Sequence, residues 1–169
     1  VVARNAAGER SAPTVGIGMF EAYPQVVLTG NVAVAATNLA YENTAVVKDG
    51  GVLTLDGAHT FASLALINGA TVTHSAATTT WESKVDLTVL HTLFISSNSA
   101  INVAGKGYLP GRTYPNTTTN GCTGYAGGSY GGLGYTNGYA NPVYGDFRNP
   151  NELGSGGAQG PGGGLVRIR

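Results

Sequence analysis

Four segments of the chain repeat one plan, in which a short apolar strand, a tight turn and a second short strand follow one another. They are VVLTGNVAV (26–34), AVVKDGGVLTL (45–55), LALINGATVTH (64–74) and LFISSNSAINV (93–103). The turns contain Asn, Asp, Ser and Gly, and Asn, Asp and Gly tolerate the left-handed backbone conformations of sharp corners. Alternating apolar residues are typical of half-buried strands, whereas the Thr, Val, Gly and Asn that dominate here are poor helix formers. The pattern therefore predicts an all-β fold.

The spacing of the turns helps to decide between two possible arrangements of these strands. The interval from Asn31 to Asp49 nearly equals that from Asp49 to Asn68, whereas Asn98 follows after a clearly longer one. In an antiparallel β-sandwich, each segment would be a hairpin, for which Asp-Gly and Asn-Gly are strong signals. In a right-handed parallel β-helix, each would be one coil of a solenoid whose corners recur about once per coil. The nearly equal first two intervals favour the β-helix, with residues 75–84 as an extra loop. The residues expected to stack inside it are Val52, Leu53 or Leu55, Leu66, Val72, Ile101 and Val103.

Glycine and tyrosine gather in the last part of the chain. Residues 101–169 hold 19 of the 27 glycines and seven of the nine tyrosines. A flexible linker has no need of tyrosine, and no phosphate-binding G-x-x-x-x-G-K-[ST] motif is present. The segment ends in GGGLVRIR (162–169), which alternates like a strand. We therefore expect a long, ordered loop that leaves the solenoid and returns to a final strand, with most tyrosine rings lying on glycine backbone.

Composition excludes several classes of partner. Only 11% of residues are charged, and nine basic residues balance nine acidic ones, so the chain has no basic footprint for nucleic acid. It has no apolar run of about 18 residues, so we expect no membrane insertion. The hydrophobic fraction of 42% is enough to build a core. The single cysteine, Cys122, is expected to be a buried thiol.

The first residues, VVARNAAGERSAP, resemble the final strand of a fibronectin type III domain. The matching positions are Val2, Arg4, Asn5, Gly8, Ser11 and Pro13. The resemblance implies that the rest of such a domain lies upstream; alternatively, this segment is the first strand of the fold that follows. The predicted organisation is then a terminal strand and linker (1–20), the solenoid coils (21–104) and the glycine- and tyrosine-rich block returning to a last strand (105–169).

A second resemblance concerns the glycine- and tyrosine-rich block. The motifs GKGYLPG (105–111), GGSYGGLG (127–134), YGDFRNPNELGSGG (144–157) and GGGLVRIR resemble a block of large secreted bacterial surface proteins of the adhesin kind. Those proteins combine fibronectin-type modules with parallel β-helices. The resemblance implies an extracellular, cell-surface setting and a structural or adhesive role without catalysis. It supplies no catalytic residue.

Uncovered strand edges at the two ends of a short β fold are templates for pairing with another chain. We therefore expect either a homopolymer that forms a fibre or larger surface structure, or contacts with neighbouring domains of a longer chain. The alternative function is a carbohydrate-binding module or a lyase-like enzyme acting on polysaccharide. Trp81 and the tyrosines keep this alternative open, because flat rings can form a sugar-stacking wall. The candidate ligand-binding residues are Trp81, Tyr108, Tyr125, Tyr130, Tyr135, Tyr139 and Tyr144.

No catalytic residue is predicted, although Asp56, Glu82, Lys84 and Asp86 supply the residue types that polysaccharide lyases use. No cofactor is expected. Oxygen ligands suited to calcium do occur together in YGDFRNPNELG, although without the regular order of a calcium loop. The candidate metal ligands are Asp146, Asn149, Asn151 and Glu152, and the competing interpretation is that they cap turns.

Overall fold

The computed structural model describes residues 24–169, and within this part no residue is helical. Valine, threonine and leucine favour strands, and glycine and asparagine end them at corners. The strands of the described part are β1 (Gln25–Thr29), β2 (Val32–Val34), β3 (Ala45–Asp49), β4 (Val52–Leu55), β5 (Gly57–Ile67), β6 (Thr71–Thr73), β7 (Val85–Ile95), β8 (Ala100–Ile101) and β9 (Val166–Ile168). The predicted strand and linker in residues 1–20, with their fibronectin resemblance, lie outside the described residues.

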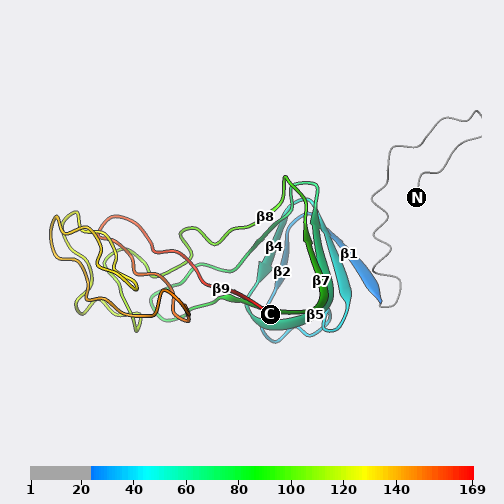
Figure 1. The fold of residues 1–169 in the computed structure, drawn as a ribbon, viewed down its shortest axis with the longest axis horizontal. Coiled ribbons are helices and arrows are strands. Elements are labelled where there is room, and N and C mark those ends of the chain that lie inside the picture. Colours follow the sequence, from blue (N-terminus) through cyan, green and yellow to red (C-terminus); the bar gives the residue numbers. More distant parts are fainter. Residues whose placement is uncertain (1–23) are drawn as a thin grey trace, which may run out of the picture.

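The strands form two parallel sheets that face each other (Figure 1). One has the order β1-β3-β5-β7-β9 and the other the order β2-β4-β6-β8. Successive strands alternate between the two sheets, and the sheets approach each other at the corners between them (Figure 1). The sheets thereby enclose one apolar interior, as expected for parallel strands, whose sheets are normally buried.

The predicted right-handed parallel β-helix is wrong. The described strands form two separate parallel sheets and no β-helical solenoid, and the antiparallel sandwich is excluded because every strand pair is parallel. A solenoid stacks repeats of similar size. Here Gln25 pairs with Ala45 and Gly57 pairs with Val85, but Val85 pairs with Val166, so the length of chain between paired strands differs several-fold. The turn spacing suggested a constant repeat that the strand pairing does not have.

The predicted core is largely confirmed. Leu53, Leu55, Leu66 and Val72 are buried in one apolar cluster between the sheets. Ile101 and Val103 are partly buried and pack against this cluster, whereas Val52 is half-buried and is not part of it. The segments 45–55 and 64–74 therefore contribute to the same interior, as their apolar alternation predicts.

The corners are held by stacked polar groups. Asn68 has a left-handed backbone, with φ of 54°, and its side-chain amide donates to Asp49 Oδ1 at 2.7 Å. Gly51 must be glycine because a Cβ there would lie 2.2 Å from the carbonyl oxygen of Gly30. Asn, Asp and Gly occur at these positions because the corners are tight and need left-handed or crowded backbone, as the sequence suggests.

The glycine- and tyrosine-rich block (residues 105–164) extends to one side of the sheets between β8 and β9 (Figure 1). Its backbone is hydrogen-bonded across distant segments, for example from Gly107 N to Gly162 O at 2.8 Å and from Tyr108 N to Gly154 O at 3.0 Å. The prediction that most tyrosine rings lie on glycine backbone is met at one contact, between the Tyr130 ring and Gly145, and otherwise stays a prediction. Other backbone segments fill the space beside many glycines, and the ring of Tyr130 beside Gly145 is the clear exception.

Buried polar groups form the interior of the block. Asn141 is fully buried, accepts from Ser129 N at 2.7 Å and donates to Thr113 Oγ1 at 3.0 Å. Cys122 lies beside it with Sγ 3.2 Å from Asn141 Oδ1, which confirms the expected buried thiol. Such a polar interior can be stable because its groups satisfy one another.

Candidate ligand-binding site

A cavity of about 500 Å³ lies between the two sheets' loops and the block. Four segments meet there: residues 35–37 after β2, residues 56–57 at the junction of β4 and β5, the loop 74–84 before β7, and the block with Leu165 that follows it. The lining residues are Ala35, Ala36, Thr37, Asp56, Gly57, Trp81, Glu82, Ser83, Lys84, Tyr108, Tyr114, Asn151, Glu152, Leu153 and Leu165. Its size falls in the range of small-molecule sites.

Two aromatic side chains on the wall of the cavity are partly open to solvent. Trp81 is 44% exposed and Tyr114 is 52% exposed. Tyr114 is backed by other rings, because it stacks on Tyr144 with centroids 5.7 Å apart, and Tyr144 meets Tyr130 edge-on at 5.1 Å. Offset and edge-on contacts of this kind are favourable and fix ring orientation. Tyr114 therefore presents a supported ring to the cavity.

Two carboxylates of the lining accept hydrogen bonds from tyrosines, one from the buried Tyr108 and one from the half-buried Tyr130. Tyr108 OH donates to Glu82 Oε2 at 3.3 Å, and Tyr130 OH donates to Glu152 Oε2 at 3.1 Å. A carboxylate has about four acceptor sites, so each Glu keeps capacity to accept from a ligand hydroxyl. The tyrosines thus orient both carboxylates.

Asp56 has a different role, because its acceptor sites are used within the protein. It accepts from Ser75 N at 2.8 Å, from Ser75 Oγ at 2.7 Å and from Ser83 Oγ at 2.6 Å. Burial opposes ionisation of this carboxyl, but the hydrogen bonds from Ser83 and Ser75 outweigh it and lower the pKa of Asp56. Asp56 is therefore an ionised anchor that attaches both ends of the loop 74–84 to the end of β4.

The tyrosines around the cavity are held in their protonated form. Burial first, and then the charge of Glu82, raises the pKa of Tyr108 far above its ordinary value. Burial likewise raises the pKa of Tyr144 to about 12 and raises the pKa of Tyr130. These hydroxyls are hydrogen-bond donors at neutral pH, not bases or nucleophiles.

His74 lies fully buried behind the cavity as a neutral imidazole. Burial lowers its pKa, its Nδ1–H donates to Ser75 O at 2.8 Å, and its Nε2 accepts from Leu165 N at 3.2 Å. The ring connects the loop 74–84 to the segment that enters β9. Its contacts are those of a structural histidine.

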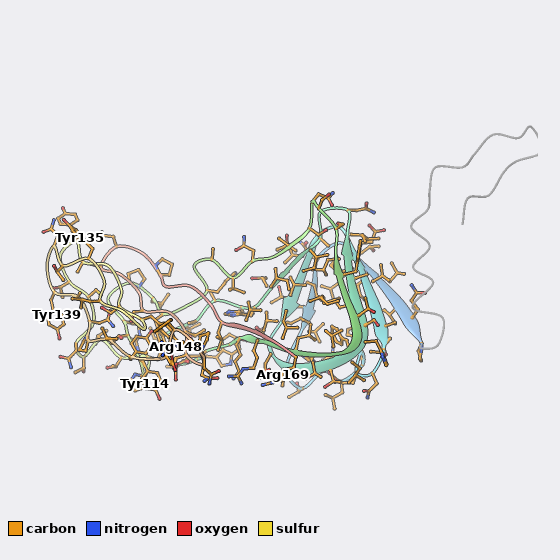
Figure 2. All side chains as sticks on the ribbon, viewed as in Figure 1. Tyr114, Tyr135, Tyr139, Arg148 and Arg169 are labelled. Carbon is orange, nitrogen blue, oxygen red and sulfur yellow. The ribbon has the colours of Figure 1, made fainter. Side chains whose placement is uncertain are left out.

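The structure brings together some of the predicted ligand-binding residues and separates the others. Trp81 and Tyr108 line the cavity, and Tyr130 and Tyr144 lie directly behind its lining. Tyr135 and Tyr139 lie at the far end of the block, away from the sheets (Figure 2). Tyr125 is 72% exposed and is not part of the lining either.

The ligand-binding residues predicted from the sequence did not include Tyr114, Glu82 or Glu152, which line the cavity. Tyr114 was hidden among seven similar tyrosines. The one sequence feature that distinguishes Tyr114 is that it lies well before Tyr125, Tyr135 and Tyr139, which are exposed in the structure. Nothing in the sequence shows which tyrosines face the loop 74–84.

Three of the four predicted metal ligands, Asp146, Asn149 and Asn151, make contacts of a turn. Asp146 Oδ1 accepts from Arg148 N at 2.8 Å, and Asn151 Nδ2 donates to Asn149 O at 3.0 Å. Glu152 instead accepts from Tyr130. Residues 24–169 contain no group of three or more His, Cys, Asp or Glu side chains placed to hold a metal. The contacts of Asp146, Asn149 and Asn151 fit the turn-capping interpretation; the expectation of no cofactor stays a prediction, with calcium as its alternative.

Comparison with known proteins identifies no relative, since no protein-family model, no curated protein and no solved structure matches the chain. In the described part of the chain, no helix has the length and apolar character needed to cross a membrane.

Proposed function

We propose that this chain is an extracellular adhesive protein that binds carbohydrate in the cavity between the sheets and the block. The observation that supports this most is that two half-exposed rings, Trp81 and Tyr114, line the same cavity as two carboxylates held by tyrosines, Glu82 and Glu152. Sugars offer flat C–H faces and many hydroxyls. Aromatic faces cover the former, and carboxylates and amides accept hydrogen bonds from the latter.

The charges of the lining favour a neutral or amino sugar. The lining contains three acidic residues, Asp56, Glu82 and Glu152, and one basic residue, Lys84. The Nζ of Lys84 lies 3.8 Å from Asp86 Oδ2. A uronic acid or sulfated sugar would meet an excess of negative charge, which opposes binding at close range. The ligand class is therefore an oligosaccharide without acidic groups.

Binding without turnover is the activity that these groups support. A glycosidase needs a carboxylic acid whose pKa is raised toward neutrality. Asp56 does not suit that role, because its pKa is lowered, and Tyr108 stays protonated as a hydrogen-bond donor. The resemblance of the block to secreted bacterial surface proteins supports the extracellular setting.

A glycan array followed by calorimetry on the best neutral glycan tests this function. Trp81→Ala and Tyr114→Ala should each weaken binding roughly ten- to hundredfold, as for a central aromatic contact. Tyr135→Ala is the matched control, because Tyr135 is 71% exposed at the far end of the block, and it should bind normally. Equal losses in all three variants, or binding of acidic glycans only, would contradict the proposal.

A further inference from the structure

The second half of β7 is an open sheet edge. β7 spans Val85–Ile95, but β9 pairs only with residues 85–87, and Arg169 O accepts from Val89 N. Among the described residues, no strand pairs with residues 92–95 on this side. Ser96 N donates to Leu66 O of β5, so by alternation along the strand the N–H groups of Leu93 and Ile95 point toward the open side.

The apolar interior ends uncovered at the same place. Leu64 and Leu66 of β5 are completely buried. Of their partners in β7, Leu93 is half-buried and Ile95 is 40% exposed. Phe94, on the other face of β7, is 39% exposed. An exposed apolar edge of this kind is a template for a further strand.

The opposite edge of the same sheet fits this template in register. Adjacent strands place Val26, Val46, Leu64 and Leu93 in one row, and Leu28, Lys48, Leu66 and Ile95 in another. A second copy of β1 added to the open edge would continue both rows, with Val26 on Leu93 and Leu28 on Ile95. Its five residues would occupy positions 92–96, which β9 leaves free.

The second sheet supports the same stacking. Val32, Leu53, Val72 and Ile101 form one row across β2, β4, β6 and β8. Val72 is completely buried and Ile101 is only half-buried. In the register just described, Val32 of the second copy would cover Ile101, so both sheets would continue at once.

We propose that copies of this chain associate end to end, with β1 of one copy adding as a parallel strand to residues 92–96 of β7 and its end in the next. This goes beyond carbohydrate binding and does not depend on it. The two ends are unlike, so the contact does not close by symmetry and generates a filament. Nine acidic and nine basic residues leave no net charge to keep copies apart.

A charge-swap experiment tests the register. Val27, 57% exposed on β1, would lie opposite Phe94 of the neighbouring copy. The wild type should grow filaments in sedimentation and electron microscopy. Val27→Lys and Phe94→Asp should each raise the concentration needed for assembly by about tenfold or more, since each leaves a charge unpaired in the contact. Mixing the two variants should restore assembly, because Lys then meets Asp at one contact and Val meets Phe at the next.

Two further measurements keep this test decisive. Leu133→Asp is the control, because Leu133 is 67% exposed in the block, and it should assemble like the wild type. On assembly of the wild type, hydrogen exchange should slow at the amides of Leu93 and Ile95. The proposal is overturned if the wild type stays monomeric, which is the result expected if another segment of a longer chain covers this edge. So does a mixture that assembles no better than the single variants.

Discussion

Lys48 occupies a position in β3 whose neighbours in the ladder are leucines. Its partners are Leu28 and Leu66, and its side chain is completely buried. The ammonium donates to the carbonyl oxygens of Leu28 at 3.3 Å, Gly30 at 2.6 Å, and also Gly50. Burial lowers its pKa, although the charge of Asp49 opposes this shift. One lysine thus connects two successive corners from the inside.

We expect Lys48→Met to lower the free energy of unfolding by about 2 kcal/mol or more, because it leaves buried carbonyl oxygens without a donor. Lys84→Met is the control. Lys84 is 39% exposed and makes only a long ion pair with Asp86, so the change should be below about 1 kcal/mol. Urea unfolding of both variants measures the difference. Equal losses would show that the corner carbonyls do not depend on Lys48.

Corner residues were predictable from sequence, and Lys48 was not. Asn and Gly have few uses other than left-handed or crowded positions, so Asn68 and Gly51 could be recognised from residue type alone. A lysine in an alternating strand is instead expected to face solvent. Its inward direction follows from the corner carbonyls, which only the folded chain brings together.

In the block, extended segments pack backbone against backbone. A Cβ on Gly162 would lie 1.9 Å from Gly154 O, and one on Gly156 would lie 2.0 Å from Leu109 O. Gly154 also donates to Gly163 O at 2.9 Å. Glycine is needed at positions 156 and 162 because neighbouring backbone leaves no room for a side chain, and neither residue has a left-handed backbone.

Two adjacent glycines offer a direct test of this packing. Gly162→Ala should destabilise the protein by about 3 kcal/mol or more, because neighbouring backbone cannot move aside. Gly163→Ala should be nearly neutral, because nothing lies within 4 Å of the position that its Cβ would occupy. Thermal unfolding of the two variants gives the comparison. Similar melting temperatures would contradict the close approach.

At the level of elements, the sequence predicted short strands but not their partners. The four strand–turn–strand segments coincide with β1–β2, β3–β4, the end of β5 with β6, and the end of β7 with β8. The backward extension of β5 to Gly57 and of β7 to Val85 was missed. Pairing of β7 with β9 joins strands that the whole block separates along the chain, which no local pattern encodes. Trp81 and Tyr108 could be proposed as ligand-binding residues from their residue type. That both line one cavity could not be predicted, because segments distant along the chain form it.

On the scale of the whole molecule, a second, smaller apolar cluster joins the block to the sheets. Ala77 of the loop, Leu165 before β9, and Tyr108 and Leu153 of the block are buried together, with Tyr144 packed against them. The cavity lies beside this joint and shares Tyr108, Leu153 and Leu165 with it. Attachment of the block and the shape of the cavity therefore depend on the same residues.

Alkaline pH should loosen this joint. The pKa of Tyr144 is about 12 in the folded chain and about 10 in an unfolded one. Its contribution to stability is therefore complete below about pH 10 and is lost as pH rises toward 12. Unfolding measured across this range should show a smaller loss for Tyr144→Phe than for the wild type. Tyr135→Phe, at a 71% exposed position, should behave like the wild type. An identical alkaline loss in all three proteins would contradict this assignment.

The pairing of β9 with β7 also has a kinetic consequence. Closing the chain between Val85 and Val166 costs only about 1 kcal/mol more in entropy than closing it between Gly57 and Val85, so the long excursion is thermodynamically cheap. Folding rate, however, falls as contacts become more distant along the chain. We expect β1 to β8 to form first and β9 to dock last, after the block has folded, which pulse-labelled hydrogen exchange would show as late protection of Val85 and Arg169 amides. During synthesis, the first half of β7 would then lack its β9 neighbour until residues 165–169 have emerged.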